Sequence, residues 1–328
     1  MTRSDERAST SPGTSASERA QADAGPSAFI TGLASFTGRY MAQRLRADGY
    51  RIAGTVQPGT AAPGIAERAY SADLLDPAAL EAALDAVQPA VVVHLAAITQ
   101  VTHEDVAQTY LVNVVGTRNL LAALARRPRP PRAVLLASSA NVYGNTDADL
   151  LDETLPPRPA NDYAISKLAM EHVARLWRDA LPLVIARPFN YTGVGQRDGF
   201  LLPKIVDHYA RGARTIALGN LDVERDFSDV RDVVEAYARL LAAAPRGETF
   251  NVCSGTGRTL HEVLDTLAGI AGYAIDVQVD PRLVRANEVR RLVGSDARLT
   301  HVLGARARIP LEDTLRWMYR AARSRYAS

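Results

Sequence analysis

The chain has 328 residues, of which 47% are hydrophobic, and its 38 basic and 36 acidic side chains leave a formal net charge of +2. This length can bury a sizeable core with or without a smaller lobe, and so small a charge excludes a global field that holds nucleic acid or an anionic membrane. A single cysteine, Cys253, excludes an intramolecular disulfide, and no stretch reaches the roughly 20 apolar residues of a membrane span, so we expect a cytoplasmic protein.

The chain begins with a polar segment, residues 1–27, that lacks the apolar core of a signal peptide and is expected to be a disordered tail. From residue 28, short β-branched runs alternate with longer amphipathic stretches, which is the pattern of βαβ units. The expected strands are 28–31, 51–56, 90–95, 133–137 and 183–186, and the expected helices are 38–48, 77–87, 104–126 and 161–180.

This alternation predicts an α/β protein with a Rossmann-type, doubly wound parallel sheet. After Pro188, glycines, prolines and arginines replace the regular pattern, which predicts a smaller α/β substrate-binding lobe. A further helix is expected at 229–243 and a strand at 249–252, so the chain should return to the first domain. The expected division is 28–187 plus about 229–253 for dinucleotide binding, and 188–228 plus about 254–328 for substrate binding.

The first expected strand runs into a Gly-rich turn from Gly32 to Gly38 and then a helix, which is the context of a phosphate-binding turn. The middle position of the Gly-x-x-Gly-x-x-Gly spacing is Ser35, which is small and could itself donate to a phosphate. The second strand ends without the acidic residue that takes a ribose 2′-hydroxyl, which favours NADPH and leaves NADH possible. Arg39 near the turn could meet a 2′-phosphate.

Tyr163 and Lys167 are four residues apart at the start of an expected helix, so both side chains project from one face. A tyrosine of pKa about 10 is a poor acid or base at neutral pH unless a cation favours the phenolate. Lys167 is predicted to supply that cation, and it is one of only two lysines in the chain. Ser139 follows the strand 133–137, at the sheet edge where ligands bind. His94 is expected to be a core histidine.

These residues resemble the extended short-chain dehydrogenase/reductase family over nearly all of the chain from residue 28 to 317. The resemblance implies that Ser139 positions a keto oxygen, that Tyr163 transfers the proton, and that Lys167 tunes Tyr163 and holds the cofactor ribose. The stretches that carry it are the Gly-rich turn, 94–97, 138–144, 163–167 and 187–190. The predicted cofactor contacts are Gly32, Ser35, Phe36, Thr37, Gly38, Arg39, Asp73, Leu74, Leu95, Ala96, Ala97, Tyr163 and Lys167.

The second lobe is similar to GDP-sugar members of this family, the GDP-4-keto-6-deoxy-D-mannose reductases and GDP-mannose 4,6-dehydratases, at residues 219–221, 225–233 and 281–289. This implies a nucleotide-sugar partner whose pyrophosphate meets Arg225 and Arg285. It also implies a homodimer formed through the expected helices 104–126 and 161–180. The predicted substrate contacts are Thr99, Ser139, Asn141, Asn190, Lys204, Arg225, Arg285 and Glu288.

The resemblance therefore implies reduction of a nucleotide-activated 4-keto-6-deoxyhexose, GDP-4-keto-6-deoxymannose to GDP-rhamnose or GDP-6-deoxytalose, without a metal. A 4,6-dehydratase or epimerase of the same family remains an alternative, as does a non-catalytic dinucleotide sensor. Dehydratases of the family carry an acidic residue two places after the catalytic Ser or Thr, which can remove the proton at sugar C5. That position is Asn141, whose amide has no useful basicity, so the sequence favours a reductase.

Overall fold

The computed structural model describes residues 25–99, 105–284 and 288–326. Residues 1–24 of the expected tail therefore lie outside the described residues, as do Arg285 and the start of the expected helix 104–126. The expected tail ends earlier than predicted, because Ser27 is buried and is the first residue of a strand. Within the described residues, no helix is both long enough and apolar enough to cross a bilayer.

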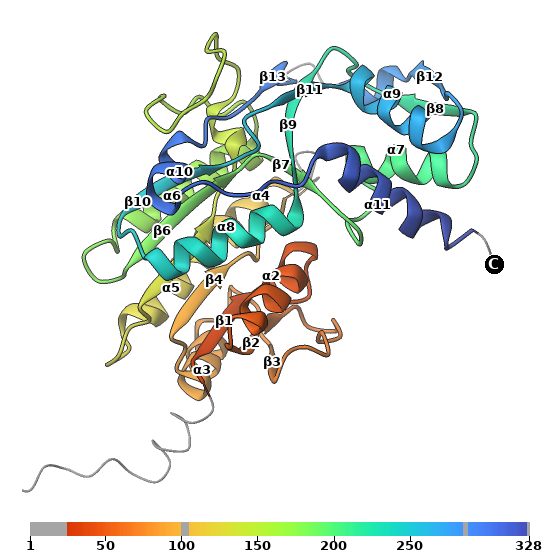
Figure 1. Cartoon of the computed structure of the whole chain (residues 1–328). Coiled ribbons are helices and arrows are strands. Elements are labelled where there is room, and N and C mark those ends of the chain that lie inside the picture. Colours follow the sequence, from red (N-terminus) through yellow and green to blue (C-terminus); the bar gives the residue numbers. More distant parts are fainter. Residues whose placement is uncertain (1–24, 100–104, 285–287, 327–328) are drawn as a thin grey trace, which may run out of the picture.

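A parallel seven-stranded sheet forms the centre of the molecule (Figure 1) and confirms the Rossmann-type α/β prediction. Its strand order is β10-β6-β5-β4-β1-β2-β3. The chain builds the sheet outward from β1 in both directions, with β2 on one side of β1 and β4 on the other. The strands are β1 (Ser27–Thr31), β2 (Arg51–Val56), β3 (Arg68–Ser71), β4 (Val91–His94), β5 (Ala133–Ala137), β6 (Leu183–Pro188) and β10 (Glu248–Val252).

Helices cover both faces of this sheet because successive strand residues point to opposite sides. Ile30 belongs to a core with α2 and α8, whereas its neighbour Phe29 belongs to a core with α3, α5 and α6. Both faces of the central strands are therefore buried, which is why their sequences are largely apolar and do not alternate. The helices are α2 (Phe36–Ala47), α3 (Pro77–Val87), α5 (Thr117–Ala125), α6 (Asp162–Arg175) and α8 (Val230–Ala243).

The expected helix 104–126 is not one regular α-helix. It consists of α4 (Val106–Tyr110), a π-helical segment η1 (Leu111–Gly116) and α5. The side chain of Asn113 leaves η1 to bond the backbone of Ile98, with its Nδ2 2.9 Å from the carbonyl oxygen and its Oδ1 2.8 Å from the amide nitrogen. A widened turn of this kind is common at functional sites. Here it fixes the segment that follows β4.

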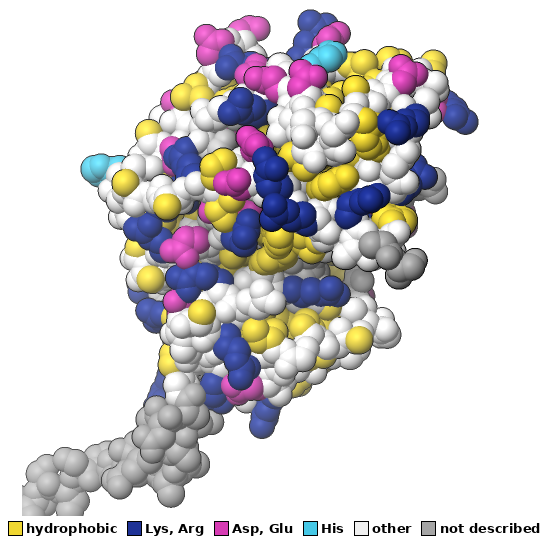
Figure 2. Space-filling model, turned by 45° about the vertical axis from the view of Figure 1, so that its right-hand side comes forward, with side chains coloured by type: hydrophobic (Ala, Val, Ile, Leu, Met, Phe, Trp, Pro, Cys, Tyr) yellow, Lys and Arg dark blue, Asp and Glu magenta, His cyan; other side chains and the backbone are white. Residues whose placement is uncertain are grey.

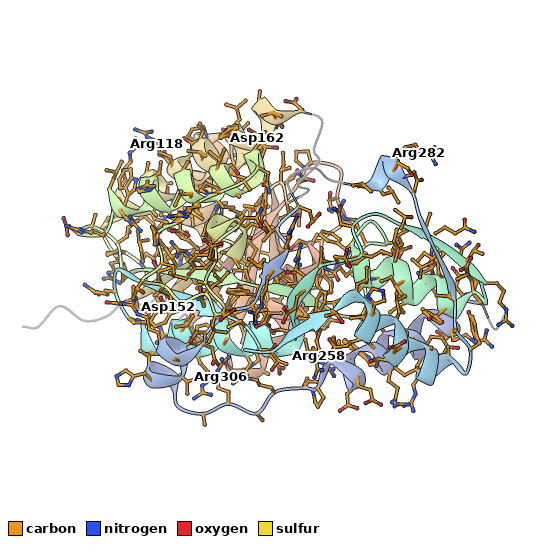
Figure 3. All side chains as sticks on the ribbon, turned by 90° about the horizontal axis from the view of Figure 1, so that it is seen from above. Arg118, Asp152, Asp162, Arg258, Arg282 and Arg306 are labelled. Atoms are coloured by element: carbon orange, nitrogen blue, oxygen red, sulfur yellow. The ribbon has the colours of Figure 1, made fainter. Side chains whose placement is uncertain are left out.

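A second group of elements packs beyond the carboxyl ends of the large sheet and surrounds a separate apolar core (Figure 1). In the view from above (Figure 3), Arg118 and Asp162 lie on helices of the large sheet, and Arg282 lies on the second group. Its strands are β7 (Asn190–Thr192), β8 (Thr215–Leu218), β9 (Glu224–Asp229), β11 (Gly257–Thr259), β12 (Asp276–Val279) and β13 (Arg291–Leu292). Its helices are α7 (Leu201–Ala210), α9 (Leu260–Ala271), η3 (Pro281–Leu283) and α11 (Leu311–Arg323).

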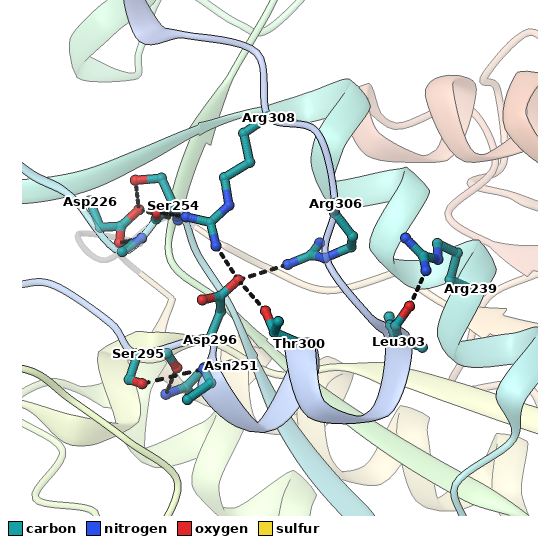
Figure 4. Close-up of polar contacts among 12 residues, drawn as sticks. Asp226, Arg239, Asn251, Ser254, Ser295, Asp296, Thr300, Leu303, Arg306 and Arg308 are labelled. Atoms are coloured by element: carbon teal, nitrogen blue, oxygen red, sulfur yellow. Dashed lines mark hydrogen bonds and ion pairs between the residues drawn. The ribbon is translucent and has the colours of Figure 1, made fainter.

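Polar contacts join the segment 296–308 to the end of β10, where Arg308 donates to the carbonyl of Ser254 (Figure 4). The carboxylate of Asp296, just before α10 (Ala297–Leu303), accepts from Thr300 and Arg306 and is paired with Arg308. The buried carboxylate of Asp226 in β9 accepts from the backbone and hydroxyl of Ser254, both at 2.7 Å. These contacts hold the end of β10 against β9, so the two groups of elements are joined at the edge where ligands of such sheets bind.

Candidate active site

The turn between β1 and α2 leaves no room for a side chain at Gly32 or Gly38. Gly32 has φ of +71°, and a Cβ there would lie 2.9 Å from the backbone nitrogen of Ala96. A Cβ on Gly38 would overlap the carbonyl oxygen of Gly32. Ser35 caps α2, its Oγ accepting from the Gly38 amide at 3.0 Å. The turn is therefore a close-fitting cradle at a helix N-terminus, which suits a diphosphate group.

The other predicted cofactor residues lie along the same edge of the sheet. Leu95, Ala96 and Ala97 follow β4 and face the turn through the Gly32 contact. Asp73 accepts from the Leu75 amide at 2.9 Å, and Asn119 of α5 donates to the carbonyl of the buried Leu74 at 3.0 Å. The Nε of Arg39 donates to the carbonyl of Ala34 at 3.1 Å, which folds this exposed side chain back over the turn.

Ser139, Tyr163 and Lys167 come together at the carboxyl end of β5. Asn161 starts α6 by accepting from the Ala164 amide at 2.9 Å, and this places Tyr163 and Lys167 on one buried face. Tyr163 is 8% exposed and Lys167 is 5% exposed. The Lys167 ammonium donates to the carbonyl of Ala137 at 2.8 Å, and the Ser139 hydroxyl is close enough to Tyr163 to lower its pKa.

The tuning of Tyr163 by Lys167 stays a prediction. Burial raises the pKa of Tyr163 to about 12, and the nearby Ser139 hydroxyl acts in the opposite direction. Burial also lowers the pKa of Lys167 to about 8, against an opposing contribution from Glu171. The Lys167 ammonium donates to the Ala137 carbonyl at the end of β5.

A buried ionic network lies behind this triad, and the sequence analysis did not anticipate it. The carboxylate of Glu171 accepts from the Ser138 hydroxyl at 2.6 Å and from Arg187 at 2.8 and 2.7 Å. Arg187 also donates to the Tyr143 hydroxyl at 3.0 Å, and that hydroxyl donates to Asn251 at 2.7 Å. The network joins β5, α6, β6 and β10 and holds Ser138, the neighbour of Ser139.

His94 is the core histidine that the sequence predicted. Its Nδ1 lies 2.7 Å from the Thr31 hydroxyl and its Nε2 lies 2.8 Å from that of Thr117. Burial, with a smaller effect of Lys167, lowers the pKa of His94 to about 3, so the ring is neutral at physiological pH. The histidine links β4 to β1 and α5.

The sequence analysis also missed Tyr191, which connects the second group of elements to the Gly-rich turn. Its hydroxyl lies 2.8 Å from that of Thr37, and its ring stacks on Phe36 at a centroid distance of 6.2 Å. Asn113 was missed as well, although an amide inside the apolar run 111–115 is a usable signal for a positioning role. Tyr191 gives no comparable signal, because its partner Thr37 lies 154 positions away.

The predicted substrate contacts are only partly brought together. Arg225 is buried and pairs with Glu288, Nη2 to Oε1, at 2.6 Å. Lys204 donates to the carbonyl of Ala217 at 2.6 Å. Asn141 lies beside Ser139 in the short helix η2 (Ala140–Tyr143). Asn190 is exposed at the start of β7, and Thr99 is exposed and is the last described residue before the gap at 100–104. Arg285 lies outside the described residues.

Comparison with known proteins agrees with this arrangement. The chain is 37% identical to GDP-6-deoxy-D-mannose reductase of Pseudomonas aeruginosa over 299 residues, 88% of this chain and 94% of that protein. It is 35% identical to GDP-6-deoxy-D-talose 4-dehydrogenase of Aggregatibacter actinomycetemcomitans over 232 residues, which is 71% of this chain and 79% of that protein.

Two solved structures share the fold over most of the chain. A protein of Burkholderia cenocepacia J2315, provisionally described as an epimerase, is 59% identical with a TM-score of 0.86 and covers 91% of this chain and 98% of its own. RMD from P. aeruginosa, solved in complex with NADPH, is 35% identical with a TM-score of 0.79 and covers 92% and 98%. The profile of the NAD dependent epimerase/dehydratase family matches residues 28–253, and the chain belongs to that family.

Proposed function

We propose that the protein reduces the 4-keto group of a GDP-linked 6-deoxyhexose, converting GDP-4-keto-6-deoxymannose to GDP-rhamnose or GDP-6-deoxytalose. The observation that carries this proposal is the meeting of Ser139, Tyr163 and Lys167 beside a turn that requires glycine at 32 and 38. Relatives named for GDP-6-deoxy-mannose and GDP-6-deoxytalose support the substrate class. The NADPH complex of RMD supports NADPH as cofactor, with NADH as the alternative.

The turn that Gly32 and Gly38 make possible, at the N-terminus of α2, suits the diphosphate of the cofactor. The diphosphate would lie at the turn from Ser35 to Gly38, the adenine beside Asp73 and Leu74, and the rest of the dinucleotide along residues 95–97. Arg39 would meet a 2′-phosphate. Bound NADPH supplies a hydride to sugar C4. The residues of the chain then have to hold the keto oxygen and give it a proton.

Tyr163 is the proton donor in this proposal. Its hydroxyl protonates the keto oxygen as C4 gains the hydride, so the ketone becomes an alcohol and Tyr163 is left as a phenolate. Ser139 donates a hydrogen bond to the same oxygen and, once the proton has moved, to the phenolate. Lys167 holds the cofactor ribose, and Glu171 opposes the effect of burial on its charge.

The substrate is proposed to bind between the two groups of elements. Arg225 and Arg285 would meet the pyrophosphate, Glu288 a ribose hydroxyl, and Thr99, Asn190 and Lys204 the remaining groups, while Asn141 would act through Ser139, which it contacts. The Arg225–Glu288 pair would place a cation and an acceptor side by side, as a phosphate next to a ribose requires. We propose the corresponding division of the chain, 28–187 with 229–253 for the cofactor and 188–228 with 254–328 for the nucleotide sugar.

We also propose that the protein is a cytoplasmic homodimer with small-molecule partners only. Apolar side chains on α4, η1 and α6 are between 40% and 43% exposed and would be covered by a second copy: Val106, Leu111, Val115 and Ile165. Basic and acidic side chains are interspersed on the face drawn in Figure 2, which supports a small-molecule partner over nucleic acid. A single buried thiol, Cys253, suits a reducing compartment.

The proposal is tested by incubating the purified protein with GDP-4-keto-6-deoxymannose and either NADPH or NADH, and identifying the product by NMR. We expect oxidation of the cofactor and a single C4 alcohol, whose configuration distinguishes GDP-rhamnose from GDP-6-deoxytalose. Matched dTDP- and UDP-linked keto sugars test whether the enzyme requires guanine as the base of the nucleotide. GDP-mannose supplied alone is expected to remain unchanged, and its dehydration would move the protein to the dehydratases.

A further inference from the structure

Two hydrogen bonds converge on the hydroxyl oxygen of Ser139, and Asn141 donates both. The backbone nitrogen of Asn141 lies 3.2 Å from Ser139 Oγ, and its side-chain Nδ2 lies 3.1 Å from the same atom. A serine hydroxyl has two acceptor lone pairs and one proton to donate. Asn141 therefore occupies both lone pairs of the Ser139 hydroxyl, and the hydrogen bond that this hydroxyl can still make is one that it donates.

The direction of that remaining bond matters, because a reduction needs a hydrogen-bond donor to the keto oxygen, whereas an elimination also needs a base at position 141. A keto oxygen has only lone pairs, so a hydroxyl can hold it only by donating. Because Asn141 occupies both lone pairs, the remaining bond of the Ser139 hydroxyl has the polarity that a keto oxygen requires.

We propose that Asn141 is a positioning residue, which fixes the Ser139 hydroxyl as a donor to the substrate keto oxygen. The inference rests on the proposed function, since it assumes that a carbonyl is reduced at this site. An acidic residue at this position would accept the Ser139 proton and turn it away from the substrate. The residue two places after the serine therefore sets the polarity of the hydroxyl as well as the presence or absence of a base.

The test is a double-mutant cycle of Asn141→Asp and Ser139→Ala, with kcat measured on the reduced keto sugar. Asn141→Asp nearly preserves shape but replaces the donor by an acceptor, and we expect kcat to fall about 100-fold, as for the loss of one oxyanion donor. Asn141→Ala removes one bond and keeps the backbone donor, so the expected loss is about fivefold. In the Ser139→Ala background both substitutions should cost little more, because the hydroxyl that they act through is gone.

The pH profile separates this polarity from a purely structural role. Below the pKa of the new carboxyl group, Asn141→Asp carries a protonated carboxyl that can again donate to Ser139, so its kcat should rise toward that of wild type as pH falls. Equal losses with and without Ser139, or full activity of Asn141→Asp at neutral pH, would overturn the proposal. Thermal melting of each variant identifies one that does not fold, in which case Asn141→Ala decides.

A measurement without substrate distinguishes failure of this inference from failure of the proposed function. The side-chain amide of Asn141 can be followed by ¹⁵N NMR and assigned by its loss in Asn141→Asp. Ser139→Ala removes the acceptor of its Nδ2 proton, so we expect that signal to move upfield. An unmoved signal overturns the role of Asn141 even if the sugar is reduced. A moved signal in a protein that reduces no GDP-keto sugar supports the bond and rejects only the proposed substrate.

Discussion

Replacing Glu171 with glutamine is expected to destabilise the protein strongly, because the change leaves Arg187 charged and buried without a counter-ion. The two side chains are 0% and 4% exposed, and the Nη2–Oε2 distance between them is 2.7 Å. Removing one partner from such a pair costs about 3–5 kcal/mol. With an unfolding entropy of about 2 cal/mol/K per residue over roughly 300 residues, that loss lowers the melting temperature by about 5–8 °C.

The assay is calorimetric melting of Glu171→Gln beside two control variants. Glu81→Gln removes the carboxylate of an exposed pair with Arg126 and should leave the melting temperature nearly unchanged. Replacing both buried partners, Glu171→Leu with Arg187→Met, should recover much of the loss, because no uncompensated charge remains. A Glu171→Gln protein that melts with wild type would show that Arg187 finds another partner and would refute this reasoning.

Three further predictions concern the active site. Tyr163→Phe should lower kcat by about 10²–10⁴-fold while NADPH affinity, measured by fluorescence titration, stays within about twofold, because only the proton donor is lost; turnover at the wild-type rate would remove Tyr163 from the mechanism. Activity should fall as pH rises through about 8, where the buried Lys167 loses its proton. In Glu171→Gln the fall should begin at lower pH, because the carboxylate that raises the Lys167 pKa is gone. An alkaline fall at the same pH in that variant would show that another group titrates. Gly32→Val should abolish NADPH binding without touching the triad, since its side chain would strike Ala96 at a φ that valine rarely adopts; retained binding would place the diphosphate elsewhere.

Local pattern was enough to predict the sheet and the catalytic helix. The strands 51–56 and 133–137 have the predicted bounds because their largely apolar runs are bounded by polar and turn residues. The four-residue spacing of Tyr163 and Lys167 needs only a regular helix to place both on one face. Fold class follows from such patterns because every crossover unit repeats the same alternation of strand and helix.

Contacts between distant segments could not be predicted in the same way. The spacing of apolar residues in 104–126 is compatible with either an α-helical or a π-helical turn. The π-helical turn occurs where Asn113 contacts the backbone of Ile98, a residue outside this segment. The partner of Lys167 is a backbone carbonyl 30 positions away, which has no sequence signature. The pairing of Arg225 with Glu288 spans 63 positions and depends on how the second group of elements closes.

The contact of Tyr191 with Phe36 and Thr37 limits how freely parts of such enzymes can be exchanged. A chimaera that takes residues 188–228 from a relative with another sugar preference would bring a new side chain against the old Gly-rich turn. Unless the residues at 36, 37 and 191 are transplanted as a matched set, the graft should disturb the packing of α2, and with it the cofactor cradle, before any sugar binds. Specificity in this scaffold is thus inherited together with part of the cofactor site.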